Sequence, residues 1–337
     1  MAGMKAQPAE EQEQLTLKTL SKEYASESKA RALLESMLWP DGPVCPHCKN
    51  HTEKPIYKIT PGKDSKAPTR SGLYKCGACR KGFTVTVGTI FEGSHIPIST
   101  WLMAIFIICS SKKSVSSKQV ERMLGVTYKT AWFMTHRIRH AMTPNHWAIP
   151  KLSGTVEVDE TFVGGKGDFR TKTARHTPVV ALIERDGPAR VKVVASVTQK
   201  NLGQVLYECV DKSAVVNTDE HPAYRKPLKE YKAHHAVNHS KVEYHRTNPD
   251  GTICTTNSAE SFFSLLKRGV FGAWHHVSPE HLPKYANEFA FRWTHRKVTD
   301  GERMETLMPL VIGKRMMYRQ PKTGVHCMPL VRPSLGL

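Results

Sequence analysis

Two pairs of closely spaced cysteines constrain the fold of this chain more than any other feature. Cys45/Cys48 and Cys76/Cys79 each form a CxxC turn, and 27 residues separate the pairs. Four thiolates from two such turns are the soft tetrahedral ligand set that Zn²⁺ prefers. The residues between them offer little apolar core, so a metal would have to hold them together. We therefore expect residues 41–95 to fold as a zinc ribbon around one structural Zn²⁺, the alternative being redox-active or coincidentally spaced cysteines.

The charge of the chain predicts a polyanionic partner. The 337 residues include 49 Lys and Arg against 30 Asp and Glu, which gives a net charge of +19 and a pI of about 9.6. The first 40 residues carry 5 basic and 6 acidic side chains, so the rest carry 44 basic and 24 acidic ones, a net charge of +20. Such a field attracts nucleic acid. The alternative is a basic protein whose charge serves only solubility.

The sequence gives no sign of a membrane span or a secretory signal. The longest strongly apolar run is the nine residues 101–109, whereas a span needs about 20. The N-terminal sequence MAGMKAQPAEEQEQ has no apolar core. We expect an intracellular protein in a reducing compartment, with the remaining cysteines as free thiols. Those cysteines are Cys109, Cys209, Cys254 and Cys327.

Residues 96–145 have the pattern of a helix-turn-helix. A short helix, a three-residue turn that contains Gly125, and a basic helix over 128–142 follow one another. In that motif the second helix enters the major groove of DNA. A helical hairpin within a bundle has the same pattern, so both interpretations stay open. The candidate DNA contacts on the second helix are Lys129, Arg137 and Arg139.

Beyond a linker near residue 150 the pattern changes to strands, and we expect a mixed α+β domain with a five-stranded mixed sheet. Asp186-Gly187 is a hairpin signal between two of the strands. A long helix begins at Asn257. The expected strands cover 155–163, 179–184, 190–197, 214–216 and 236–239, with a helix over 202–210 before the fourth.

Three acids stand at the ends or starts of these expected elements. Asp159 and Asp219 each follow an apolar strand, and Glu260 lies in the first turn of the long helix. Phosphodiester chemistry with two divalent metals needs carboxylates that converge from rigid elements, and Mg²⁺ requires hard oxygen ligands. Each acid also has an ordinary structural interpretation. Asn257 and Glu260, for example, match a helix-capping pair.

Basic and aromatic residues surround the third acid in the sequence. Glu260 and Lys267 share one face of the expected helix, which suits a metal beside a phosphate. Arg268 follows directly, and His275-His276 stands after an aromatic residue and before a Ser-Pro turn. Such a segment could hold DNA near the acids by charge and stacking, although these charges also fit an ordinary solvated surface.

Taken together, these motifs resemble the bacterial insertion-sequence transposases of the ISXO-like group, in which a zinc ribbon precedes a DDE catalytic domain. The resemblance covers about residues 20–300. The segments that carry it are CPHC (45–48), CGAC (76–79), VEVDETFVGG (156–165), VNTDEHPAY (216–224) and the stretch 256–296 that begins TNSAESFF.

The resemblance implies a ribonuclease H-like catalytic fold, two Mg²⁺ ions replaceable by Mn²⁺, and DNA transposition at terminal inverted repeats. It makes Asp159 and Asp219 the first two catalytic acids, and Glu260 the third. Lys267 becomes the phosphate-contacting lysine. The third ligand in this family is either Glu or Asn, so Asn257 remains an alternative to Glu260.

The implied organisation has five parts. They are an N-terminal helical segment (1–40), the zinc ribbon (41–95), the helix-turn-helix segment (96–145), the ribonuclease H-like DDE domain (150–300) and a C-terminal tail (301–337). The implied partners are transposon ends, target DNA and at least one second copy of the chain, in a bacterial cytoplasm at the nucleoid. Two alternatives remain: a non-catalytic zinc-ribbon DNA-binding regulator, and a ribonuclease H-like nuclease without strand transfer.

Overall fold

A computed structural model describes residues 15–60, 71–144, 149–164, 176–237, 245–247 and 251–317. The chain divides into two compact units. The first comprises residues up to 85 together with 95–110 and 299–308, and the second comprises 86–94, 111–298 and the residues from 309 onward. Each unit is therefore built from segments that are distant in the sequence.

Four helices form the helical part of the first unit. They are α1 (Leu17–Glu23), α2 (Glu27–Leu38), α3 (Ile98–Ser110) and α9 (Asp300–Leu307). α3 is almost entirely apolar and its side chains are mostly buried, because α1, α2 and α9 all pack against it. Glu27 caps α3 by accepting the Ile98 N–H at 2.8 Å.

A three-stranded antiparallel sheet completes the first unit. Its strands are β1 (Ile56–Ile59), β2 (Leu73–Cys76) and β3 (Gly82–Phe83), in that order. Tyr74 on β2 donates a hydrogen bond to Glu35 of α2 at 2.9 Å. Trp39 packs edge-on against the rings of Tyr74 and Phe83. This small aromatic cluster joins the ribbon to α2.

The second unit is organised around a five-stranded mixed sheet with the order β6-β5-β4-β7-β8. β4 pairs antiparallel with β5 and β5 with β6, whereas β7 runs parallel to both β4 and β8. The strands are β4 (Thr155–Val163), β5 (Thr177–Glu184), β6 (Ala189–Val193), β7 (Val215–Thr218) and β8 (Ala233–Ala236). A separate two-stranded sheet pairs β9 (His245–Thr247) with β10 (Ile253–Thr255).

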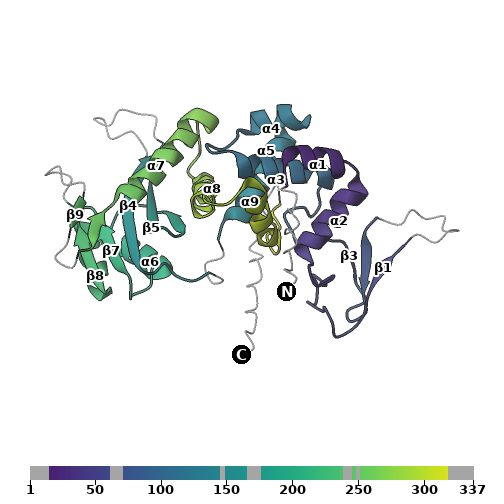
Figure 1. Cartoon of the computed structure of the whole chain (residues 1–337), viewed down its shortest axis with the longest axis horizontal. Coiled ribbons are helices and arrows are strands. Elements are labelled where there is room, and N and C mark those ends of the chain that lie inside the picture. Colours follow the sequence, from purple (N-terminus) through teal and green to yellow (C-terminus); the bar gives the residue numbers. More distant parts are fainter. Residues whose placement is uncertain are drawn as a thin grey trace, which may run out of the picture. The chain divides into compact units, whose positions relative to one another are not determined.

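Helices cover both faces of this sheet. One face packs against α7 (Asn257–Gly269) and α8 (Leu282–Thr294), and the other against α6 (Gln199–Cys209) (Figure 1). Val156 and Val158 of β4 belong to the core on the α6 side. Since side chains alternate along a strand, the intervening Glu157 and the following Asp159 face the α7 side.

Two further helices, α4 (Ser117–Leu124) and α5 (Tyr128–Met142), pack against each other, and α5 also packs against α8. The contact between α5 and α8 contains a buried ion pair, in which Arg139 Nε donates to Glu288 Oε2 at 2.6 Å. Arg292 donates to the other oxygen of the same carboxylate at 2.6 Å. Two arginines thus compensate the burial of one glutamate.

The mixed five-stranded sheet that the sequence predicts is confirmed, but its last strand lies earlier than expected. β8 covers Ala233–Ala236, whereas the sequence predicted 236–239; the residues 238–244 lie outside the described part of the chain. The sequence of β8 has two histidines and no apolar alternation, and its strand geometry comes from parallel pairing with β7.

No helix in the described part of the chain combines the length and the apolarity that crossing a bilayer requires.

Candidate functional site

The four cysteines of the ribbon converge on one point. Cys45 Sγ lies 3.7 Å from Cys79 Sγ, and Cys48 Sγ lies 3.7 Å from Cys76 Sγ. All four sulfur atoms lie within 4.8 Å of one another. Four Zn–S bonds of about 2.3 Å in a tetrahedron require sulfur–sulfur distances of about 3.8 Å. The cluster therefore has the ligands and the spacing of a structural Zn²⁺ site.

The two CxxC turns have the same local construction. Lys49 N–H donates to Cys45 O and Arg80 N–H donates to Cys76 O, both at 2.9 Å. Lys49 and Arg80 each adopt a positive φ, 62° and 60°, which closes the turn on its sulfur atoms. Backbone N–H groups directed at its sulfur lower the pKa of Cys76 to about 6, so this turn favours a thiolate, the form that binds metal.

The described cysteines outside the ribbon do not join this cluster. Cys109, Cys209 and Cys254 are buried and form no disulfide with another described cysteine, and Cys327 lies outside the described residues.

Asp159 and Asp219 lie beside each other on the large sheet, Asp159 in the middle of β4 and Asp219 directly after the end of β7. β4 and β7 are parallel neighbours, paired at Thr155↔Val215 and Glu157↔Asn217. Continuing this register brings Asp159 level with Asp219, which directly follows β7. β4 continues to Val163, so Asp159 does not end its strand as the sequence predicted. The two acids meet because the shorter β7 ends beside the middle of β4.

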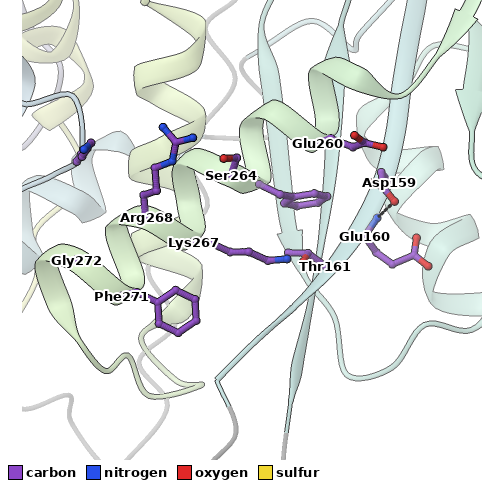
Figure 2. A pocket seen from close by; sticks show the side chains of 11 residues that line it. Asp159, Glu160, Thr161, Glu260, Ser264, Lys267, Arg268, Phe271 and Gly272 are labelled. Atoms are coloured by element: carbon purple, nitrogen blue, oxygen red, sulfur yellow. Dashed lines mark hydrogen bonds between the residues drawn. The ribbon is translucent and has the colours of Figure 1, made fainter. Parts of the chain in front are cut away.

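Glu260 joins these acids from α7, which packs against β4. Asp159, Glu260 and Lys267 all line one cavity of about 810 Å³. Figure 2 shows Glu260 pointing from the start of α7 toward Asp159 on β4, with Lys267 extending toward the strand further along the helix. Ser264 lies between them on the same helical face, as the i, i+4, i+7 spacing predicts.

The electrostatics of this cavity favour a cation. Burial, together with the negative charges of Glu160, Asp219 and Glu260, raises the pKa of Asp159 to about 7. Such a set of oxygen donors, costly to ionise together, suits a hard divalent ion. Within the described residues, however, the only convergent group of three or more possible metal ligands is the set of four thiolates.

Sequence reasoning missed Glu160 as a member of this site. Its side chain lines the cavity and accepts a hydrogen bond from the Tyr224 hydroxyl. Burial raises the pKa of Glu160, and the charge of Asp219 adds to that effect. Strict alternation along β4 would direct Glu160 away from Asp159, which is why it was overlooked. The available signal was the Asp-Glu pair, which occurs both within β4 (159–160) and directly after β7 (219–220).

The capping alternative for Asn257 and Glu260 does not describe the start of α7. The N-cap residue is Thr256, and its side chain makes no capping bond. Asn257 is the first helical residue, with its N–H donating to Thr255 Oγ1 at 3.1 Å. The N–H of Ser258 donates to the buried Glu157 of β4 at 2.8 Å. A strand carboxylate thus takes the place of the expected cap.

The predicted basic residues near the third acid are exposed. Lys267 and Arg268 line the cavity together with Lys113 and Phe271, whose side chain is 71% exposed (Figure 2). His275 and His276 are exposed but are not among the lining residues.

Two of the three DNA contacts predicted on α5 have buried side chains. Arg137 is 5% exposed and donates to the Ile90 carbonyl at 2.5 Å, and Arg139 is 1% exposed and paired with Glu288. Their charges serve packing within the second unit, and in this structure neither side chain can reach DNA. The sequence predicted exposed side chains here, because a basic residue on an amphipathic helix is expected to face solvent unless a buried acidic partner is known. Lys129, by contrast, is exposed.

Comparisons with known proteins identify both parts of the chain. Residues 151–294 match the family described as "ISXO2-like transposase domain" of the IS1595 type, and residues 25–82 match the "Transposase zinc-ribbon domain" of the same type. A protein from Halobacterium salinarum, described as "Uncharacterized protein in transposable element ISH50", is 26% identical over 313 residues, which cover 85% of this chain and 97% of that protein.

Two solved structures were also matched at low similarity. The Mos1 strand transfer complex shares 13% identity over 56% of this chain and 74% of that chain, with a TM-score of 0.22. A pre-cleavage Mos1 transpososome shares 15% identity over 58% and 74%, with a TM-score of 0.23. These scores are too low to establish a common fold, so the assignment rests on the sequence matches. Both domains that characterise IS1595-type insertion-sequence transposases match this chain in the expected order, which supports its assignment to that family.

Proposed function

We propose that this transposase binds the terminal inverted repeats of an insertion sequence, cleaves the DNA there in a Mg²⁺-dependent reaction and joins the ends to target DNA. The observation that carries the proposal is the cavity beside β4 and α7, which combines Asp159 and Glu260 with Lys267. The negative charge of Asp219 also contributes to the raised pKa of Asp159, which indicates that the two carboxylates are close. The sheet order, with three antiparallel strands followed by two parallel ones, supports a ribonuclease H-like catalytic domain.

In this proposal Asp159, Asp219 and Glu260 hold two Mg²⁺ ions, or Mn²⁺ in their place. The ions would activate the attacking oxygen and stabilise the leaving one. The chain's own residues orient this site. The Tyr224 hydroxyl holds Glu160 by a hydrogen bond, and Lys267 offers an ammonium group to a phosphate from the same wall as Glu260.

DNA binding is proposed to rest on exposed cations. Arg268 and Lys113 line the catalytic cavity with Lys267, and Lys129 is exposed on α5 of the helix-turn-helix segment. The zinc ribbon and this segment would read the transposon end, with His275 and His276 close to the end of α7. Since transposition joins two ends, we propose at least a dimer as the active form.

The function is tested with a supercoiled donor plasmid that carries the coding region and its natural flanking DNA. With Mg²⁺ and a second plasmid as target, we expect cleavage at inverted repeats and joined donor–target products. Binding without cleavage would instead identify a regulator, and cleavage without joining would identify a nuclease. Either result would contradict the proposal.

A further inference from the structure

A buried carboxylate lies two residues before Asp159 on the same strand. Glu157 has no exposed surface, and a carboxylate in such a place needs hydrogen-bonded partners. Its Oε2 accepts a hydrogen bond from the Ser258 N–H at 2.8 Å, and its Oε1 accepts one from the Arg185 guanidinium at 3.2 Å. Glu157 is therefore fully engaged, although it is not a lining residue of the catalytic cavity.

The partner of Glu157 is the start of the helix that carries Glu260. The first N–H groups of a helix have no partner within the helix, and the N-cap side chain of Thr256 supplies none to α7. A negative charge at this end also interacts favourably with the helix dipole. Glu157 thus caps α7 from a strand that lies 101 residues away in the sequence.

The same network reaches the strand of the second acid. Asn217 is the register partner of Glu157 and is 1% exposed. Its Nδ2 donates to the Ile253 carbonyl at 3.5 Å, and Arg185 donates to the same carbonyl at 2.9 Å. One chain of contacts therefore runs from Glu157 through Arg185 and Ile253 to Asn217.

The residues that make these contacts have the same spacing in the sequence from the three acids. Glu157, Asn217 and Ser258 each precede an acid by two residues, on β4, β7 and α7 respectively. Two residues along a strand bring a side chain back to the same face of the sheet, and two residues along α7 remain within its first turn. A displacement of the Glu157–Ser258 contact would therefore change the spacing between Asp159 and Glu260.

We propose that Glu157 is a positioning residue, which fixes the distance between Asp159 and Glu260 by capping α7. Arg185 and Asn217 extend this role to the strand of Asp219. The inference rests on the proposed function, in which these acids bind divalent cations. Its consequence is specific: loss of the cap weakens cation binding and leaves DNA binding unchanged, because the exposed cations are not part of the network.

The test compares Glu157→Ala with the conservative Glu157→Gln in the full chain. Hydrogen exchange of the Ser258 amide reports the cap, and electron paramagnetic resonance with Mn²⁺ alone reports cation binding. In Glu157→Ala we expect the Ser258 amide to exchange about tenfold faster and Mn²⁺ affinity to fall by about tenfold or more. Glu157→Gln keeps an oxygen that can accept the N–H, so it should restore much of both.

The matched control is Thr198→Ala. Thr198 caps α6 by accepting the Asn201 N–H at 3.3 Å, and α6 packs on the opposite face of the same sheet. This variant should lower the melting temperature without changing Mn²⁺ affinity. Equal losses of Mn²⁺ affinity in Thr198→Ala and Glu157→Ala would show that Glu157 only stabilises the fold, and would overturn the proposal. Unchanged Mn²⁺ affinity in a folded Glu157→Ala variant would overturn it as well.

The two proposals fail in different ways. If the wild-type chain binds no Mn²⁺, the proposed function fails, and the role of Glu157 in spacing cation ligands fails with it, even where Ser258 exchange still reveals the cap. If the wild-type chain binds Mn²⁺ and cleaves DNA but Glu157→Ala does so equally well, only the positioning role is refuted. If Glu157→Ala does not fold, Glu157→Gln decides. A folded Glu157→Gln variant with the Ser258 exchange rate and the Mn²⁺ affinity of the wild type supports the cap, and a folded variant that keeps the Mn²⁺ affinity but loses the Ser258 protection contradicts it.

Discussion

Glu260 and Asn257 begin the same helix, but only Glu260 lines the cavity that contains Asp159. The family resemblance allows either Glu or Asn as the third ligand, and the residue types alone could not choose between them. We propose Glu260 as the third ligand, because the start of α7 is capped by Glu157 rather than by a pair formed from Asn257 and Glu260.

Glu260→Gln should therefore abolish Mg²⁺-dependent cleavage while the fold stays intact, because the amide lacks the negative charge that holds a cation. Asn257→Ala should retain most of the cleavage activity. Both variants are assayed side by side on the same supercoiled donor, with circular dichroism as the check on folding. Full activity in Glu260→Gln together with loss in Asn257→Ala would transfer the ligand role to Asn257.

His136 makes the stability of the second unit depend on pH. Its ring is fully buried beside Tyr285, and burial, with the charges of Arg139 and His281, lowers its pKa to about 3. An unfolded histidine titrates near pH 6.5. Between these values the unfolded chain binds a proton that the folded chain excludes, so this contribution to stability is present above about pH 6.5 and is lost as the pH falls toward 3.

We expect the free energy of unfolding to fall by up to about 1.4 kcal/mol per pH unit from this group as the pH drops below 6.5. Urea unfolding at pH 7 and pH 5 measures it, and the non-titrating variant His136→Gln should show a shallower dependence. Identical slopes for the two proteins would show that His136 does not stay neutral in the fold.

At the scale of elements, the ribbon and α5 show two ways in which polar residues stabilise this chain. The ribbon has short strands and depends on a metal that its four thiolates are spaced to bind. α5 instead packs through the buried pair of Arg139 with Glu288. The sequence predicted the first from spacing alone, whereas the second depends on α8, almost 150 residues further on, and no local pattern reveals it.

Cys76→Ser should leave the purified protein without zinc and unfold the ribbon, because three thiolates cannot complete the tetrahedral site. The large sheet should stay folded, since it belongs to the other unit. Zinc content is measured by elemental analysis, and Cys209→Ser, which changes a thiol far from the ribbon in sequence, is the control. A wild-type protein that contains no zinc would contradict the assignment.

Arg139→Ala and Lys129→Ala separate packing from DNA contact on one helix. Removing Arg139 leaves the buried Glu288 incompletely compensated and should cost about 3–5 kcal/mol of stability. Removing the exposed Lys129 should leave the melting temperature unchanged but weaken DNA binding and reduce its salt dependence by about one phosphate contact. A stable Arg139→Ala variant with weakened DNA binding would restore Arg139 as a DNA contact.

At the scale of the whole molecule, periodic and closely spaced signals were predictable from the sequence and long-range contacts were not. The mixed sheet, the long helix from Asn257 and the cysteine cluster follow from local patterns. The position of β8, the burial of Arg139 and the inclusion of Glu160 in the cavity depend on neighbours distant in the chain. Residues 300–307 illustrate the same point, because they form α9 and pack with α3 in the first unit.

The account's central claim is that acids from three separate elements form one catalytic site. The most direct measurement is Mg²⁺-dependent end cleavage by Asp219→Asn, compared with the wild type and with Asp211→Asn. Asp211 precedes β7 at the end opposite Asp219 and is exposed, and its carboxylate accepts a hydrogen bond from the Ser213 hydroxyl. We predict that Asp219→Asn slows cleavage by orders of magnitude, that Asp211→Asn cleaves normally, and that both bind donor DNA like the wild type. Normal cleavage by a folded Asp219→Asn protein would contradict the account.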